Sequence, residues 1–152
     1  MKKLIVLSAM ALFMVSCKPT MDAKSQVGLK GNWTLTHVKH IGGEFVKVNS
    51  FNIADSKCFI GSQWKFVSNN NSGSLSLTSG ADCPEFDSNF KWTISPSGEF
   101  SFKFVDQGEK AKHVTTGYAL RVANQSESSF QLVDKIAVGG QTSDVIYQFQ
   151  RN

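Results

Sequence analysis

The side chains most able to take part in chemistry are three cysteines and three histidines. Cys58 and Cys83 have no histidine nearby at the spacing typical of a zinc site. The pair therefore favours a disulfide over a shared metal ion, although both readings are open at this stage. A disulfide here would close a loop of about 26 residues and, in the chain-entropy model, stabilise the fold by roughly 3–4 kcal/mol.

The histidines do not form a recognisable catalytic arrangement. None of His37, His40 and His113 stands in an acid–base or nucleophile pattern. His37 and His40 are three residues apart, and on a strand such a pair points to opposite faces, which disfavours joint metal binding. We therefore expect no enzyme activity, no metal site and no cofactor.

The first cysteine follows an export-like leader. Lys2 and Lys3 precede an apolar run from Leu4 to Val15, which is too short for a membrane-spanning helix of roughly 20 residues. Met14-Val15-Ser16-Cys17 resembles the lipobox of bacterial lipoproteins. The resemblance implies lipidation of Cys17, cleavage before it and, with Lys18 rather than Asp next, the outer membrane. An ordinary signal with a coincidental cysteine is the alternative. Either destination is oxidising, which favours the disulfide.

These features divide the chain into three parts. Residues 1–16 are the expected signal peptide, residues 17–30 a lipidated cysteine with a flexible tether, and residues 31–152 one domain. The chain has 16 basic and 12 acidic residues, and two of the basic residues leave with the signal. The remaining basic residues are scattered, which argues against a nucleic-acid partner.

Beyond Lys30 the apolar residues alternate with polar ones, which is typical of strands with one buried face. The turn-like stretches between these runs predict an all-β fold, an antiparallel up-and-down meander closed into a small barrel of about eight strands. That count includes a strand at Glu44–Val48. Asn49–Ser62 and Gly108–Thr116 break the rhythm and are expected to be mobile loops or single helical turns. The alternating runs begin with Trp33, Leu35 and His37 and end with Val145, Tyr147 and Phe149.

Gly31-Asn32-Trp33, at the start of the first predicted strand, resembles the G-x-W signature of lipocalins. In that family the tryptophan plugs the closed end of the barrel and an arginine near the end of the last strand packs across it. Arg151 is the matching residue. In a closed meander with an even number of strands, the start of the first strand and the end of the last lie at the same rim, which supports the Trp33–Arg151 pair independently. The mature chain resembles the small lipocalin-like lipoproteins of Gram-negative bacteria.

The resemblance implies an envelope protein that binds or carries a small hydrophobic molecule. Inward aromatic side chains of the predicted barrel could line a pocket for it. They could equally fill the interior and leave no cavity, because large aromatics bury much surface. In that case the protein would be an interaction or inhibitor module that uses its loops, with a protein partner not identified by the sequence. The candidate ligand-binding residues are Trp64, Phe66, Trp92, Phe102, Phe104, Tyr118 and Tyr147.

Overall fold

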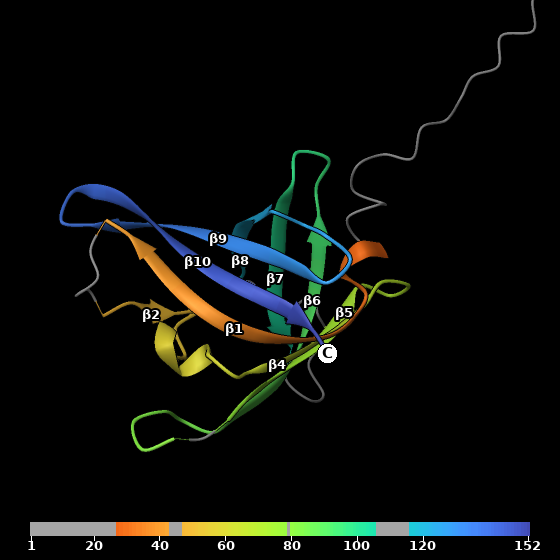
Figure 1. The fold of residues 1–152 in the computed structure, drawn as a ribbon, viewed down its shortest axis with the longest axis horizontal. Helices are drawn as coiled ribbons and strands as arrows, with labels where there is room; N and C mark the ends of the chain where they lie inside the picture. Colours follow the sequence, from red (N-terminus) through yellow and green to blue (C-terminus); the bar gives the residue numbers. More distant parts are fainter. Residues whose placement is uncertain (1–26, 43–46, 79, 106–115) are drawn as a thin grey trace, which may run out of the picture.

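The computed structural model describes residues 27–42, 47–78, 80–105 and 116–152. In this part of the chain eight strands form a closed barrel in the order β1-β10-β9-β8-β7-β6-β5-β4, and each strand pairs antiparallel with its neighbours (Figure 1). The fold is therefore the expected all-β meander closed into a small barrel. The eight strands are β1 (Gly31–Ile41), β4 (Gln63–Val67), β5 (Ser72–Leu77), β6 (Phe86–Ile94), β7 (Glu99–Val105), β8 (Tyr118–Ala123), β9 (Ser129–Val138) and β10 (Gln141–Arg151).

The barrel has about the predicted number of strands, but the strands that make up this number differ from those predicted. The runs around Trp64 and Leu75 are two strands joined by a hairpin, in which Asn71 has a left-handed φ of 52°. Most of the predicted Glu44–Val48 strand, and Gly108–Thr116 up to residue 115, lie outside the described residues. Within the described part, the chain next pairs at β2 (Asn49–Ser50) with β3 (Ala54–Asp55), followed by the 3-10 turn η1 (Ser56–Phe59).

The first strand also corrects the predicted pattern of faces. A register shift between Leu35 and His37 breaks the alternation, so the inward series continues with Val38 and His40 rather than with His37. His37 is exposed as a result. A β-bulge of this kind inserts one extra residue and reverses which side chains face the interior beyond it. His37 and His40 nevertheless face opposite sides, as expected from their spacing.

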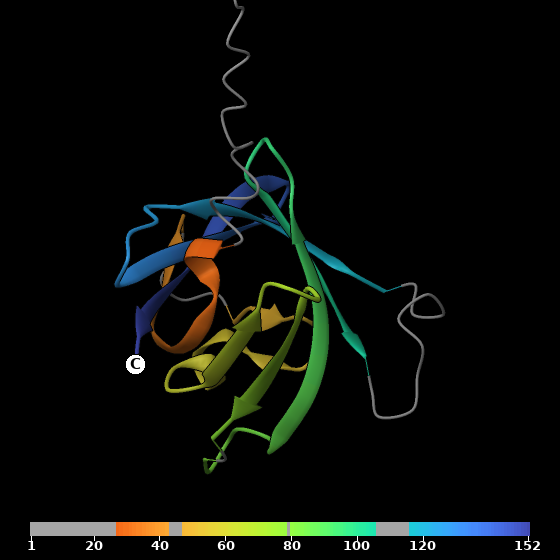
Figure 2. The same ribbon diagram turned by 90° about the vertical axis from the view of Figure 1, so that its right-hand side faces the viewer.

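The meander gives the barrel two distinct ends. The connections β4–β5, β6–β7 and β8–β9 lie at the end where β1 begins, which we call the closed end. The segment from β1 to β4, the β5–β6 connection and the β9–β10 turn lie at the opposite, open end. Figure 2, turned by 90° from Figure 1, shows the short β2–η1 segment (yellow) among the surrounding strands.

Aromatic residues fill the space between the strands. The largest fully buried aromatic side chains are less than 2% exposed, and they come from β1, β4, β6, β7, β9, β10 and η1. The described residues contain no helix that is long and apolar enough to span a membrane. The fully buried aromatic side chains are Trp33, Phe59, Trp64, Phe66, Phe90, Trp92, Phe100, Phe130, Tyr147 and Phe149.

Candidate functional site

The segment between β1 and β4 enters the open end of the barrel. We call residues 48–62 the plug segment. The stretch Asn49–Ser62 within it was expected to be a mobile loop or a single helical turn; it contains a helical turn, η1, and is packed against the barrel. Its serine hydroxyls are buried as well, so the segment contributes both apolar and polar groups to the interior. Its buried residues are Val48, Ser50, Phe51, Ala54, Ser56, Cys58, Phe59 and Ser62.

Phe51 is at the centre of this insertion. Its side chain is 6% exposed and is surrounded by rings from four barrel strands and from η1. Phe51 and Asn52 both have a φ of 55°, a left-handed conformation that asparagine adopts readily but that costs a bulky residue such as Phe51 of order 1–2 kcal/mol. We call the surrounding rings the Phe51 chamber. Ring centroids lie at 5.1 Å (Phe102), 5.3 Å (Tyr118), 5.3 Å (Phe59), 5.4 Å (Tyr147) and 6.4 Å (Trp64) from that of Phe51.

Polar contacts hold the plug segment to inward side chains of the barrel. The Tyr118 hydroxyl donates to the Phe51 carbonyl at 2.6 Å. The Tyr147 hydroxyl and Ser50 Oγ share a hydrogen bond of 2.5 Å. His40 Nε2 lies 3.0 Å from Ser56 Oγ. The attachment to these three barrel strands is therefore polar, while the ring of Phe51 fills the apolar space between them.

A disulfide attaches the plug segment to a fourth place. Cys58 in η1 is bonded to Cys83 in the β5–β6 connection, with a Cα–Cα distance of 5.4 Å. The disulfide expected from the sequence is therefore present. Because Cys58 belongs to the plug and Cys83 to a barrel connection, the bond restrains the plug covalently as well as closing a loop.

Asp134 is an acidic side chain that faces the barrel interior at the open end. Its partner across β9–β10 is Val145, which is fully buried, and directly opposed residues of an antiparallel pair share a face. Burial raises the pKa of Asp134 from its ordinary value, and a hydrogen bond from the Lys135 backbone lowers it by less. Burial likewise raises the pKa of the Tyr147 hydroxyl, the hydrogen bond with Ser50 lowers it, and the Asp134 charge raises it by less. Asp134 and Tyr147 lie on the same face of the paired strands, since Asp134 is opposite Val145 and Tyr147 is two residues further along β10.

The seven candidate ligand-binding residues fall into two groups. Trp64, Phe102, Tyr118 and Tyr147 form the Phe51 chamber. Phe104 packs beside it, 5.3 Å from Phe102 and 6.0 Å from Tyr118. The remaining two, Phe66 and Trp92, have ring centroids 5.4 Å apart and belong to the cluster with Phe100.

The closed end is sealed by the Trp33–Arg151 pair. The two residues are direct partners across β1 and β10, and the Arg151 guanidinium carbon lies 4.1 Å from the centroid of the Trp33 ring. Trp33 Nε1 donates to the Leu29 carbonyl at 2.8 Å, and Leu29 is fully buried. The folded domain therefore begins upstream of residue 31, the expected boundary.

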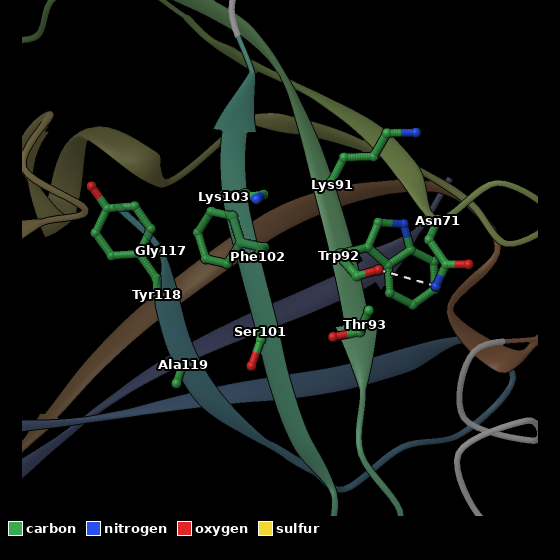
Figure 3. Close-up of a pocket in the computed structure, with 10 residues that line it drawn as sticks. All are labelled: Asn71, Lys91, Trp92, Thr93, Ser101, Phe102, Lys103, Gly117, Tyr118 and Ala119. Atoms are coloured by element: carbon green, nitrogen blue, oxygen red, sulfur yellow. Dashed lines mark hydrogen bonds between the residues drawn. The ribbon is translucent and has the colours of Figure 1, made fainter. Parts of the chain in front are cut away.

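A separate hollow lies outside the barrel. A groove of about 380 Å³ follows the outer face of β6, β7 and β8 (Figure 3). It is on the outer side because Thr93, Ser101 and Ala119 alternate along their strands with buried inward residues. At its edge Asn71 Nδ2 donates to the Trp92 carbonyl at 3.0 Å. Its lining residues are Asn71, Lys91, Trp92, Thr93, Ser101, Phe102, Lys103, Gly117, Tyr118 and Ala119.

Sequence reasoning did not select Phe51, Phe59 or Asp134. The first two lie in a stretch without strand periodicity, where an isolated aromatic residue gives no direction. Asp134 lies on β9 between Leu132 and Ile136, which face inward, so the period-two alternation of this strand could have predicted that Asp134 faces inward too. Among the described residues, no group of three or more His, Cys, Asp or Glu could hold a metal ion.

Known proteins resemble this chain only weakly in structure and not in overall sequence. The sequence matches none of the curated proteins with which it was compared. Among solved structures, bovine odorant-binding protein in complex with its natural ligand shares 12% identity at a TM-score of 0.47, over 82% of this chain and 72% of that one. Odorant-binding protein OBP1 shares 8% identity at a TM-score of 0.48, over 84% of this chain and 73% of that one. The siderocalin Ex-FABP shares 10% identity at a TM-score of 0.39, over 82% of this chain and 71% of that one.

Similarities this weak do not extend to a ligand. The family assignment rests instead on the sequence itself, because a model of the lipocalin-like domain matches residues 29–130, which is more than half of the chain. The match begins at the buried Leu29 and includes β1 with Trp33, the plug segment, the five strands β4 to β8 and the first residues of β9. The chain therefore belongs to the lipocalin-like domain family.

Proposed function

We propose that this protein is an envelope lipoprotein that binds a small hydrophobic molecule inside its barrel, in the place now taken by the Phe51 ring. The observation that carries the proposal is the origin of that ring. Four of the five rings of the chamber come from barrel strands and the fifth, Phe59, from η1, whereas their occupant comes from a segment that connects two strands. An apolar chamber with a few polar groups at its edge is typical of small-molecule sites.

The energetics of the plug are compatible with exchange. Burying a phenylalanine side chain contributes about 1.5–3 kcal/mol. The left-handed backbone at Phe51 opposes this by about 1–2 kcal/mol. A hydrophobic ligand that fills the chamber replaces the apolar contacts of Phe51 and releases the backbone strain. We therefore expect ligand binding to displace the ring at a modest net cost.

The test is a fluorescence titration with the neutral apolar probe N-phenyl-1-naphthylamine. Phe51→Ala removes the competing ring, so we expect it to bind the probe about tenfold more tightly than the unaltered protein. Phe130→Ala is the matched control, because Phe130 is equally buried but packs on Trp33 at the closed end, with a ring distance of 4.7 Å. Equal affinity in Phe51→Ala and the unaltered protein would place the probe elsewhere.

The groove outside the barrel requires its own control. Ala119 is exposed and lines that groove. Ala119→Trp should fill the groove without touching the chamber, and we expect it to leave the probe affinity unchanged. Loss of binding in Ala119→Trp would contradict an interior site.

The membrane tether is a proposal from the sequence, since residues 1–26 lie outside the described part of the chain. Cys17→Ser in the exporting host is expected to abolish incorporation of radiolabelled fatty acid and to release the protein from the membrane fraction. Retention of label in this variant would exclude lipidation at Cys17.

The alternative function is a protein-interaction or inhibitor module with a packed interior. The observation in its favour is the same ring packing around Phe51, which fills the chamber in this structure. The titration separates the two functions. If neither the unaltered protein nor Phe51→Ala takes up an apolar probe, the packed-interior function replaces the carrier function.

A further inference from the structure

The barrel interior combines aromatic walls with one feature that a site for purely apolar molecules does not need. Asp134 faces inward near the open end, in register with Val145 on β10, which in turn is in register with His40 on β1. In the described part of the chain, no arginine or lysine side chain forms a hydrogen bond or ion pair with Asp134. Asp134 accepts a hydrogen bond from the backbone N–H of Lys135, whose own side chain is exposed.

A carboxylate in such a position is costly unless a cation or donor accompanies it. Moving an ionised group out of water disfavours the charged form, and a nearby opposite charge compensates. Polar side chains of the barrel that bond to the plug segment in the interior are His40, which is next to Ser56, and the hydroxyls of Tyr118 and Tyr147. The tyrosine hydroxyls bond to the plug segment, and Tyr118 does so as a donor, so their oxygens keep lone pairs that can accept from a ligand once the plug is displaced.

The Phe51 chamber is suited to a cation for a second reason. Aromatic rings attract a cation through the negative electrostatic potential of their faces. An ammonium group has three N–H donors and no acceptor, so a carboxylate and tyrosine oxygens match it. A carboxylate ligand would instead be repelled by Asp134.

We propose that the preferred ligand of the barrel is a small hydrophobic amine, whose apolar part occupies the Phe51 chamber and whose ammonium group pairs with Asp134. This inference rests on the proposed function and specifies its ligand class. Tyr118 and Tyr147 act as additional acceptors once the plug segment moves, and Asp134 is the group that distinguishes amines from neutral and anionic molecules of the same shape.

The test uses three ligands of closely similar shape in isothermal titration calorimetry on the full exported protein at pH 7. They are 2-phenylethylamine (cationic), 2-phenylethanol (neutral) and 3-phenylpropanoate (anionic). We expect the amine to bind about tenfold more tightly than the alcohol and the anion to bind most weakly. Asp134→Asn keeps the shape of the side chain but removes its charge. It should lower the affinity for the amine to that of the alcohol and leave the alcohol unchanged.

Asp87→Asn is the matched control, because Asp87 is an exposed acidic residue on the outer face of β6. It should preserve the preference for the amine. Equal affinity for amine and alcohol, insensitive to Asp134→Asn, or failure of the amine to bind a protein that takes up N-phenyl-1-naphthylamine, overturns the amine preference and leaves hydrophobic binding in place. Failure of this neutral probe and of all three ligands to bind either the unaltered protein or Phe51→Ala overturns the proposed function, and the amine preference with it.

Discussion

Arg151 stacks on Trp33 and at the same time binds the chain segment that precedes Trp33. Its guanidinium donates to the carbonyls of Gly28 and Lys30, both at 2.8 Å, and to the Glu127 carbonyl at 2.6 Å. One side chain thus joins the start of the domain, the β8–β9 turn and the end of the last strand. The planar fork of the guanidinium makes this combination available to arginine and not to lysine.

Replacement of Arg151 should therefore destabilise the closed end. Arg151→Lys keeps the charge but loses the stacking and at least two of the three hydrogen bonds. We expect a loss of about 1–3 kcal/mol in the free energy of unfolding, measured by urea denaturation. Arg121→Lys is the control, since Arg121 is exposed on β8. Equal stability of the two variants would show that the contacts of Arg151 contribute little.

The position of Arg151 leaves no room for a side chain at Gly31. Its φ is +127°, and a Cβ built there would lie 2.6 Å from Arg151 Nη1. Gly31→Ala should cost more than Gly98→Ala, because Gly98 has a φ of +84°, closer to the left-handed well, and no atom within 4 Å of its Cβ position. The difference in unfolding free energy between the two variants combines the contact with Arg151 and the greater backbone strain at Gly31, and we expect it to be about 1 kcal/mol or more. Equal losses in the two variants would contradict this explanation of Gly31.

The Cys58–Cys83 disulfide should control the plug segment more than the barrel. Removal of the bond by the double substitution Cys58→Ser and Cys83→Ser is expected to cost roughly 3 kcal/mol. Hydrogen exchange should accelerate most at the Ser56 and Ser62 amides, which bond to the backbone of Val48 and Phe59. Amides of the β9–β10 ladder report the barrel, and a uniform acceleration across both regions would indicate loss of the whole fold instead.

The tyrosine hydroxyls are expected to affect stability and ligand affinity in opposite directions. Tyr147→Phe and Tyr118→Phe each remove one hydrogen bond to the plug segment and keep the ring. Each should lower the unfolding free energy by about 0.5–3 kcal/mol, and each should raise the affinity for the neutral probe because the plug is displaced more easily. A variant that loses both stability and probe affinity would contradict a plug that competes with ligand.

The sequence predicted the barrel and its closed end better than the open end, for a physical reason. Period-two alternation fixes which residues of β6, β7 and β10 face inward, because every second side chain must be buried. The pairing of Trp33 with Arg151 follows from the even number of strands. The bulge after Leu35 interrupts the period-two alternation, because one inserted residue moves His37 outward and His40 inward.

The plug segment has no such periodicity. Phe51 is buried by a backbone that turns twice through left-handed conformations, and neither Phe51 nor Asn52 signals that turn as a glycine would. The contacts that determine its position come from residues distant in sequence, such as Tyr118 and Tyr147. The candidate site could therefore be predicted as a set of barrel walls but not with its occupant.

The inward carboxyl of Asp134 should give the stability of the protein a distinctive pH dependence. Burial raises its pKa in the folded state above the ordinary value of 3.8, so the folded state binds the proton more tightly than the unfolded state. The contribution of the Asp134 carboxyl to stability is fully present below about pH 3.8 and is lost as the pH rises through the raised pKa of the folded state.

Above that pKa the ionised carboxylate opposes folding, and Asp134→Asn should melt at a higher temperature than the unaltered protein. The gain should shrink as the pH is lowered towards 4 and the carboxyl becomes neutral. Thermal melts from pH 4 to pH 8, with Asp87→Asn as the control for loss of one charge, check this. A gain that does not change with pH would mean that the amide stabilises through packing or hydrogen bonding rather than through the absence of charge.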